Sequence, residues 1–322
     1  MEIGSFIELQ FPKGRELYKG GKNIVRLNSG RAAIWHAFRV LGCDAIWIPY
    51  YQCDTVRDFL KRKGTTIKYY QTDSNFNPVD LEPGEKEAVL LVNYYGIMSH
   101  QRMADLASKY ENVIIDNSQA FFNAPISGCM NVYSARKFVG APDGSYVIGE
   151  GAEKYVDEYE QCYSSDTSLF LLQRIEYGCD GKTYQTRSVN EHRIDAEDIM
   201  KMSKLTRTIL DGTEYEYIRN KRRDNFEIAS KLFGDVNRIN PKMYYQDDCV
   251  PMVYPLVVED DSLLQRLLDA KHFQGHWWSY LLDEMPKDSF EYWISRYVIP
   301  ITIDQRYGEE ELLQILKTVE NR

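Results

Sequence analysis

Three short segments of the chain carry residue types that could share one chemical task. Lys137 lies in "VYSARKFVGAPDGSYVIG" (132–149), three residues after Ser134, on a short connection between two apolar segments. Asp116 directly follows an apolar run, and the triplet "SGR" at 29–31 opens a helical pattern. A free helix start favours an anion. An amine, a carboxylate and an anion-binding backbone together indicate a site for covalent chemistry on a charged ligand.

Each of these residues also has a simpler interpretation. Lysine is among the residues least often buried, so Lys137 on a connection could be a solvated side chain. An aspartate at a strand end often forms a turn, and Ser29 has the position and residue type of a helix N-cap. The order and spacing of the three segments, more than any one residue, favours a functional site.

The pattern of the first half predicts the elements that position these residues. Strand-like and helix-like segments alternate, which is typical of βαβ units with a mostly parallel sheet. In such sheets functional groups collect at the carboxyl ends of the strands, where Asp116 and Lys137 are expected. The expected helices cover 29–42, 53–64 and 101–111, and the expected strands include 45–51, 66–73, 87–96 and the start of 112–122.

The second half has a different pattern. Residues 151–200 are polar, tyrosine-rich and irregular. A helical stretch at 195–210 and a long charged helix at 214–233 follow, and a strand-helix-strand-helix pattern begins near residue 250. We therefore predict an α/β protein, with a three-layer α/β/α large domain and a smaller C-terminal α/β domain. The predicted domains cover 1–212 and 213–322. The basic cluster at 221–223 is expected on a solvated face, with contact to an anion as the alternative.

Composition limits the function classes. The chain has 322 residues, of which 43% are hydrophobic, so a sizeable core can form and disorder is excluded. A net charge of -9 argues against a general nucleic-acid binder. The six cysteines form no CxxC pair, and the pair His272 and His276 lacks an HExxH motif, so no metal site is expected.

The same residues bear on location. The cysteine pattern fits a reducing compartment. The first residues lack a signal-peptide pattern, and no apolar run approaches the roughly 20 residues needed to cross a bilayer. We expect a cytoplasmic protein that binds neither nucleic acid nor membrane.

A lysine, a carboxylate and a phosphate site are the parts that pyridoxal phosphate requires. The lysine amine forms a Schiff base with the aldehyde. The carboxylate pairs with the pyridinium nitrogen and keeps it protonated, while a helix N-terminus and a hydroxyl hold the phosphate. A dinucleotide-binding protein is the less favoured alternative, because no GxGxxG follows the first strand.

Nearly the whole chain also resembles a known family, the DegT/DnrJ/StrS aminotransferases, which use pyridoxal phosphate and have the aspartate-aminotransferase type of fold. "LNSGRAAIWHAFRVLG" (27–42) is similar to the family's SGTxAL segment and helix. "VNYYGIMSHQRMADLASKYENVIIDNSQAFF" (92–122) resembles its H-x-Y-G segment, helix and E-D-x-A-Q-A motif. "SARKFVGAPDGSYVIG" (134–149) resembles the lysine segment with its glycine-rich turn, and 298–320 resembles the C-terminal strand and last helix.

The resemblance implies a role for each matching residue. Lys137 would be the Schiff-base lysine and proton shuttle, and Asp116 would pair with the pyridine nitrogen. The remaining cofactor contacts implied are Gln119 beside the ring, backbone N–H groups of Gly30 and Arg31 with Ser29 on the phosphate, and the hydroxyl of Ser134. The ring-stacking position is Cys53, with Tyr50 and Tyr51 as alternatives.

Several positions depart from the family pattern. The family has S-F-H-x-x-K where this chain has S-x-x-K, and Arg31 replaces a threonine or serine. Asn93 stands at the histidine of H-x-Y-G. Family members that dehydrate sugars have histidine in place of the lysine, so Lys137 favours transamination. These departures identify the chain as a divergent member whose substrate could differ.

The resemblance implies transfer of an amino group from an amino acid, with glutamate as the expected donor, to a keto sugar that is expected to be nucleotide-linked, in the synthesis of surface polysaccharide or secondary-metabolite sugars. It also implies a homodimer in which residues of 151–200 approach the partner's cofactor. Polar residues of that segment suit a nucleotide diphosphate sugar, although a solvated loop is as good an interpretation. These residues are Tyr163, Tyr177, Tyr184, Arg187, Asn190, His192 and Arg193.

Other interpretations stay open. A pyridoxal-phosphate dehydratase, lyase or amino-acid aminotransferase keeps the cofactor and changes the reaction, and a non-catalytic regulator keeps only the fold. Arg296 is a candidate for the donor carboxylate, with a surface salt bridge as the alternative.

Overall fold

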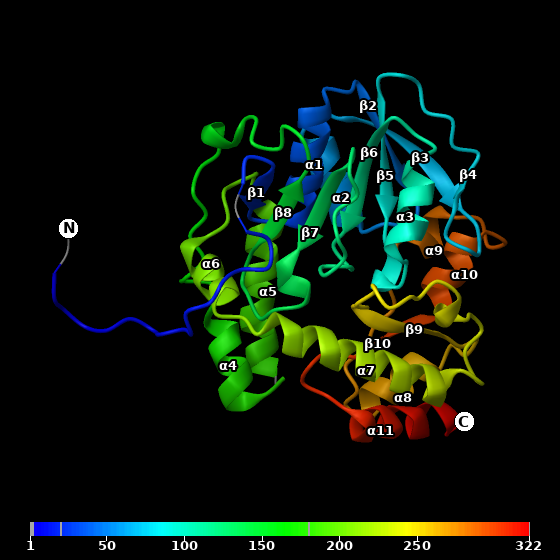
Figure 1. Cartoon of the computed structure of the whole chain (residues 1–322). Coiled ribbons are helices and arrows are strands. Elements are labelled where there is room, and N and C mark those ends of the chain that lie inside the picture. The colour runs from blue at the N-terminus through cyan, green and yellow to red at the C-terminus, as the bar shows by residue number, and fades with distance from the viewer. Residues whose placement is uncertain (1–2, 20, 180, 322) are drawn as a thin grey trace.

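The computed structural model describes residues 3–19, 21–179 and 181–321 (Figure 1). The strands of the first 150 residues form one sheet of eight strands in the order β1-β8-β7-β6-β5-β2-β3-β4. The strands are β1 (Ile24–Leu27), β2 (Ala45–Pro49), β3 (Thr66–Thr72), β4 (Pro78–Val79), β5 (Glu87–Val92), β6 (Asn112–Asn117), β7 (Met130–Ser134) and β8 (Ser145–Ile148).

The centre of this sheet is parallel. β3, β2, β5, β6 and β7 run in one direction, while β4, β8 and β1 pair antiparallel at the two sides. The register pairs Val92 with Asp116 and Asp116 with Val132, so the carboxyl ends of the three central strands lie level. The predicted α/β fold with a mostly parallel sheet is confirmed, and its functional edge holds Asp116 as expected.

Helices connect the parallel strands: α1 (Gly30–Leu41), α2 (Asp54–Arg62) and α3 (His100–Ala107). The sequence signals that predicted α1 are present at both of its ends. Ser29 caps its start, and Gly42, at φ 68°, ends it in the left-handed conformation that glycine adopts readily. Its small residues Ala33 and Ala37 are fully buried, so the helix packs closely on the sheet.

The second half is more regular than the sequence suggested. Residues 151–200 are not an irregular segment, because they contain α4 and α5. The helix expected over 195–210 begins only at Lys204. The remaining elements are α4 (Leu169–Tyr177), α5 (Gly181–Ala196), α6 (Lys204–Asp211), α7 (Tyr215–Phe233), β9 (Val253–Val257), α8 (Leu263–Asp269), α9 (Leu281–Glu284), α10 (Phe290–Tyr297), β10 (Val298–Thr302) and α11 (Glu309–Glu320).

Strands β9 and β10 form a separate antiparallel pair, beside which α7 and α11 pack (Figure 1). One apolar core joins the large sheet to this part, since Leu91 and Ile115 belong to the same cluster as Leu256 and Ile299. A second core lies between the sheet and α1 and α2. The division into domains after residue 212 stays a prediction.

No helix within the described residues is long and apolar enough to span a membrane.

Candidate functional site

Asp116 is buried at the carboxyl end of β6, with 4% of its surface exposed. One carboxylate oxygen accepts a hydrogen bond from Nε2 of Gln52 at 3.1 Å, and the other accepts from the backbone N–H of Ser118 at 2.9 Å. A buried carboxylate is tolerated only with such partners. The two donors fix its orientation. Sequence analysis missed Gln52, whose only signal is its position at the end of β2.

Gly30 is the point where three site segments meet. A Cβ built on Gly30 would lie 3.1 Å from Oγ of Ser118 and 4.0 Å from Cβ of Ser134. The start of α1, the turn after β6 and the end of β7 are therefore in contact. Glycine allows this close approach because any side chain would crowd the Ser118 hydroxyl. Ser118 is a second residue that sequence analysis missed, although it stands between Asp116 and Gln119.

The start of α1 offers backbone donors rather than a hydroxyl. Oγ of Ser29 accepts from the N–H of Ala32 at 3.4 Å, so this side chain caps the helix. The N–H groups of Gly30 and Arg31 have no partner within a helix by geometry, and the helix dipole adds partial positive charge there. The structure thus provides the capping role for Ser29, while its predicted cofactor contact stays a prediction.

The side chain of Arg31 belongs to a different contact. Its guanidinium forms an ion pair with Asp195 of α5 at 2.6 Å, and only 9% of the side chain is exposed. Arg136, next to the candidate lysine, pairs with Glu191 of the same helix. Arg31 can therefore serve the site only through its backbone, as expected.

Lys137 is at the end of η2 (Ala135–Lys137), directly after the buried Ser134. Its side chain is exposed, so the interpretation as a solvated side chain on a connection describes its exposure in this chain. Within the residues that the structure describes, no hydrogen bond or ion pair engages its amine. The physical reason is that an unpaired ammonium group is costly to bury. The amine is therefore free for chemistry, three residues along the chain from Ser134.

Asp143, which is fully buried, holds the turn after the lysine. One carboxylate oxygen accepts from the N–H of Ser203 at 2.8 Å, and the other accepts from the hydroxyls of Ser203 at 2.7 Å and of Thr206. Gly144 adopts φ 117°, which L side chains rarely adopt, and a Cβ there would lie 2.8 Å from Cγ2 of Thr206. Aspartate and glycine at these two positions are required by the turn itself.

This turn also connects the lysine segment with the start of α1. The N–H of Gly144 donates to the carbonyl of Asn28 at 2.8 Å, and the carbonyl of Gly144 accepts from Ala135 at 3.2 Å. Oγ of Ser145 donates to the carbonyl of Ser29 at 2.8 Å. The backbone on both sides of Gly30 and Lys137 is therefore fixed by one hairpin.

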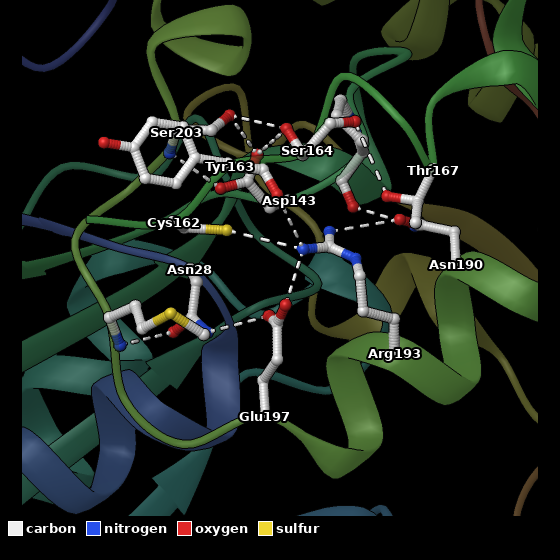
Figure 2. Close-up of polar contacts among 12 residues, drawn as sticks. Asn28, Asp143, Cys162, Tyr163, Ser164, Thr167, Asn190, Arg193, Glu197 and Ser203 are labelled. Atoms are coloured by element: carbon white, nitrogen blue, oxygen red, sulfur yellow. Dashed lines mark hydrogen bonds and ion pairs between the residues drawn. The ribbon is translucent and has the colours of Figure 1, made fainter. Parts of the chain in front are cut away.

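Figure 2 shows how Asn28 is held from its other side. Its amide nitrogen donates to the carbonyl of Asp198 at 2.9 Å and to Glu197 at 3.4 Å, while its oxygen accepts from the N–H of Met200 at 3.2 Å. Arg193 donates to Glu197 at 2.6 Å. The loop before α1 is thus tied to the end of α5.

Two residues predicted to face a ligand are used in this contact. Arg193 is surrounded by Glu197, by the carbonyl of Tyr163 at 3.3 Å and by Sγ of Cys162 at 3.5 Å (Figure 2). Asn190 is fully buried and donates to the carbonyl of Pro142 at 2.9 Å. Their assignment to substrate binding is wrong for this chain, because their polar groups are satisfied inside the protein.

The side chains predicted beside the cofactor ring, Gln119 and Cys53, have different neighbours in the structure. Oε1 of Gln119 accepts from the N–H of Tyr95 at 2.6 Å, so this side chain is held by backbone. Gln52, the partner of Asp116, also accepts from the N–H of Cys53 at 2.9 Å. Gln52 therefore brings the predicted ring-stacking position and the carboxylate together, and the thiol of Cys53 is half-buried.

Tyr51, an alternative for ring stacking, is unsuitable. It is fully buried and its hydroxyl shares a 2.5 Å hydrogen bond with that of Tyr95. Burial, with the neighbouring phenol, raises the pKa of Tyr51 well above its usual value. The half-buried Tyr50 lines a groove at the β3–β4 edge of the sheet.

Arg222 differs from the expectation of a solvated basic cluster. It is 3% exposed, donates to the carbonyl of Met252 at 2.8 Å, and its guanidinium lies 4.6 Å from the ring centroid of Phe138. Burial lowers the pKa of Arg222 to about 10. Phe138 follows Lys137 directly, so this cation–π contact packs the backbone that carries the lysine.

Arg296 lies at the surface and forms a two-point ion pair with Asp261, at 2.6 and 2.8 Å. The alternative of a surface salt bridge therefore describes Arg296. In the described part of the chain, no group of three or more histidine, cysteine, aspartate or glutamate side chains could hold a metal ion.

No protein-family model and no curated protein sequence matches this chain. Solved structures do. The sugar aminotransferase CalS13 from Micromonospora echinospora is 14% identical, with a TM-score of 0.63 over 92% of this chain and 87% of that one. The aminotransferase TlmJ from Streptoalloteichus hindustanus is 13% identical, with a TM-score of 0.63 over 93% and 85%. The GDP-4-keto-6-deoxy-D-mannose-3-dehydratase of E. coli, with bound hydrated PLP, is 14% identical, with a TM-score of 0.59 over 92% and 87%. At these identities the likeness establishes the fold, and the predicted fold type is confirmed.

Proposed function

We propose that this chain is a pyridoxal-phosphate-dependent sugar aminotransferase and a divergent member of the DegT/DnrJ/StrS family. The observation that carries the proposal is the convergence at Gly30. There the free N–H groups of a helix start meet Ser118 and Ser134, beside a buried, oriented Asp116 and a lysine with a free amine. The solved structures named above support the same class.

The residues present fit the cofactor. The N–H groups of Gly30 and Arg31 would hold its phosphate, with hydroxyls of Ser118 and Ser134 in reach of the same point. Asp116 would keep the proton on the pyridine nitrogen. When bound, pyridoxal phosphate supplies an electron sink for the carbanion formed next to the amino group.

The chain's own part in the reaction is proton transfer and orientation. The amine of Lys137 would take the proton from the carbon that bears the amino group and return one at the neighbouring position. Gln52 and the N–H of Ser118 hold the carboxylate of Asp116 in one orientation throughout. The Gly144 turn fixes the backbone near Lys137. The amine would therefore move by rotation of the lysine side chain while this backbone stays in place.

We further propose glutamate as amino donor and a nucleotide-linked keto sugar as acceptor, in polysaccharide or secondary-metabolite synthesis. The structural neighbours include a sugar aminotransferase and a nucleotide-sugar dehydratase, which supports a sugar substrate. The free amine at position 137 favours transamination over dehydration.

We propose a homodimer in the cytoplasm. The α4–α5 hairpin (169–196) exposes large apolar side chains, which mark an interface when they gather on one face. α5 also pairs with Arg136, next to Lys137, so the hairpin that a partner would cover contacts the lysine segment. All six cysteines are free thiols, which fits a reducing compartment. The exposed side chains are Leu169, Leu172, Ile175, Tyr177, Tyr184 and Val189.

Absorption spectroscopy tests the proposal. Purified protein with added pyridoxal phosphate should develop a visible band that disappears with glutamate. A keto sugar on a nucleotide carrier should restore it faster than oxaloacetate or pyruvate. Lys137→Ala should abolish the band, while Lys204→Ala, an exposed lysine on α6, should not. A wild-type protein that forms no band would contradict the proposal, and faster recovery with a simple keto acid would remove the sugar.

A further inference from the structure

A cavity of about 380 Å³ opens at the edge of the large sheet, and neither Gly30 nor Lys137 lines it. It lies between the ends of β3 and β4 and the end of α9, which approach one another in Figure 1. Its volume is at the lower end of the range of about 300–1,000 Å³ that is typical of ligand sites. The cavity therefore has room for one small ring rather than for a nucleotide.

Two tyrosines that stack on each other line one side of this cavity and form its aromatic wall. The rings of Tyr50 and Tyr69 stack with centroids 5.0 Å apart and an angle of 19° between their planes. The backbone of Tyr50 is held on both sides, since its N–H donates to Tyr70 at 3.0 Å and its carbonyl accepts from the hydroxyl of Tyr280 at 3.2 Å. The wall is preformed, and aromatic walls of this kind suit the C–H face of a saturated ring.

Polar groups surround the wall. Gln71, Asp80 and Glu284 all line the cavity and all are exposed. Carboxylates and a side-chain amide accept hydrogen bonds from hydroxyl groups, and the amide also donates. A ligand with several hydroxyls could thus be bound without displacing any contact of the fold.

Charge narrows the ligand class. Glu284 forms an ion pair with Arg57 at 2.6 Å, and this guanidinium lies 4.7 Å from the ring centroid of Tyr280. The carboxylates of Asp80 and Glu284 outnumber the single guanidinium of Arg57, so the net negative charge disfavours a phosphate or a uronate. The same guanidinium beside the cavity disfavours a cationic ligand. The remaining class is a neutral ring that carries hydroxyl groups.

We propose that this groove, lined by Tyr50, Tyr69, Gln71, Asp80 and Glu284, is a saccharide-binding site for a neutral pyranose. It does not require a cofactor and is independent of the proposed reaction. It shares one loop with the candidate active site, because Tyr50 is two residues from Gln52, the side chain that donates to Asp116.

Titration of the full chain with methyl α-glucoside, methyl α-galactoside and methyl α-mannoside, followed by calorimetry or saturation-transfer NMR, tests the proposal. At least one glycoside should bind saturably with a dissociation constant below about 50 mM, and glucuronate should bind more weakly. Tyr69→Ala should weaken binding by about tenfold or more, which is about 1.4 kcal/mol. Asp80→Asn should weaken it less and keeps a residue type that tolerates the left-handed φ of 49° at this position.

The matched control is Tyr217→Ala, which removes another largely exposed tyrosine, on α7. It should bind the glycoside as the wild type does, and thermal unfolding should show that all variants are folded. Absence of saturable binding to all three glycosides, equal binding of glucuronate, or wild-type affinity in Tyr69→Ala would each overturn the proposal.

Two sources of the saccharide are distinguished by competition. Displacement of the glycoside by a nucleoside-diphosphate hexose, and not by the nucleoside diphosphate alone, assigns the groove to the sugar part of such a molecule. If the free glycoside binds and the nucleoside-diphosphate hexose does not displace it, the groove accepts a separate saccharide. Failure of the proposed aminotransferase function would change neither result.

Discussion

Two neighbouring regions of the chain are stabilised in different ways. The first, which we call the cradle, consists of segments 28–31, 116–119, 134–137 and 142–145, and buried hydrogen bonds hold it together. The second is the α4–α5 hairpin (169–196), where α4 buries only one side chain, Gln173. The contacts that hold the cradle lie within one chain, whereas the outer face of the hairpin exposes large apolar side chains.

The inner face of the hairpin explains why the two regions belong together. α5 contributes Asp195 to Arg31, Glu191 to Arg136 and Asn190 to the carbonyl of Pro142. Each contact reaches a different cradle segment. The hairpin therefore positions the cradle from one side while it offers the other side to solvent.

The largest effect on activity is expected at the centre of the cradle. Asp116→Asn keeps the shape and removes the charge, so turnover should fall by roughly a hundredfold or more, which is about 2.7 kcal/mol in activation free energy. Steady-state transamination kinetics check this, with the exposed Asp235→Asn as control. Near-normal turnover in Asp116→Asn would assign the pairing role to another residue.

Asp143→Ala should be the most destabilising cradle substitution. It leaves the buried N–H and hydroxyl of Ser203 and the hydroxyl of Thr206 without their acceptor, which costs about 3–5 kcal/mol. Urea unfolding measures the loss. Asp143→Asn retains one acceptor oxygen and should lose less. If both variants unfold like the wild type, the turn is not held by this carboxylate.

Arg193→Met tests the contact between the two regions. Removal of the guanidinium leaves Glu197 without its 2.6 Å partner at a site where both side chains are mostly buried, so about 2 kcal/mol of unfolding free energy should be lost. Arg207→Met, at an exposed position on α6, should lose less than about 0.5 kcal/mol. Equal losses in the two variants would mean that the Arg193 network contributes nothing.

The outer face of the hairpin should behave in the opposite way. Ile175 is 81% exposed, so Ile175→Asp should change the unfolding free energy of one chain by less than about 0.5 kcal/mol. It should nevertheless dissociate the proposed dimer, because a charge would enter an apolar interface. Light scattering measures whether the dimer dissociates, with Thr208→Asp on α6 as the control. A stable dimer in Ile175→Asp would place the interface elsewhere.

The smallest effect concerns pH and α1, the helix that begins in the cradle. Nε2–H of His36 donates to the carbonyl of Ala152 at 2.7 Å, and Nδ1 lies 2.8 Å from the hydroxyl oxygen of Tyr159. Burial lowers the pKa of His36. The unfolded chain takes up its proton first, near pH 6.5, so stability is complete above that pH and declines below it. His36→Gln should flatten this decline in urea unfolding between pH 7 and 5, and an unchanged slope would contradict the assignment.

The sequence predicted the cradle better than the hairpin for a physical reason. Segments such as 29–42 have strong local signals: a capping serine, a run of small apolar residues and a terminal glycine. Asp116 was placed correctly because an apolar strand precedes it. These signals are local, and the parallel sheet then brings the strand ends together.

The hairpin lacks such signals. α5 packs through ion pairs and amide contacts to Arg31, Arg136 and Pro142, and its sequence has few apolar residues at helical spacing. The exposure of Lys137 could not be read from its apolar neighbours, because those neighbours are buried while the short η2 turn leads the amine outward. Gln52 and Ser118 have no local pattern, since their roles depend on contacts across the sheet.

The hydrogen bonds of Asn28 also determine when this site can form during synthesis. Asn28 bonds to Asp198, which lies 170 residues further along the chain. A ribosome adds roughly 5–20 residues per second, so the loop before α1 waits about ten seconds or longer for its partner. Contacts over such separations form late, because a long loop must close first. The sheet can therefore assemble while the start of α1 is still unsupported, and the proposed ability to hold a cofactor should be among the last properties that the growing chain acquires.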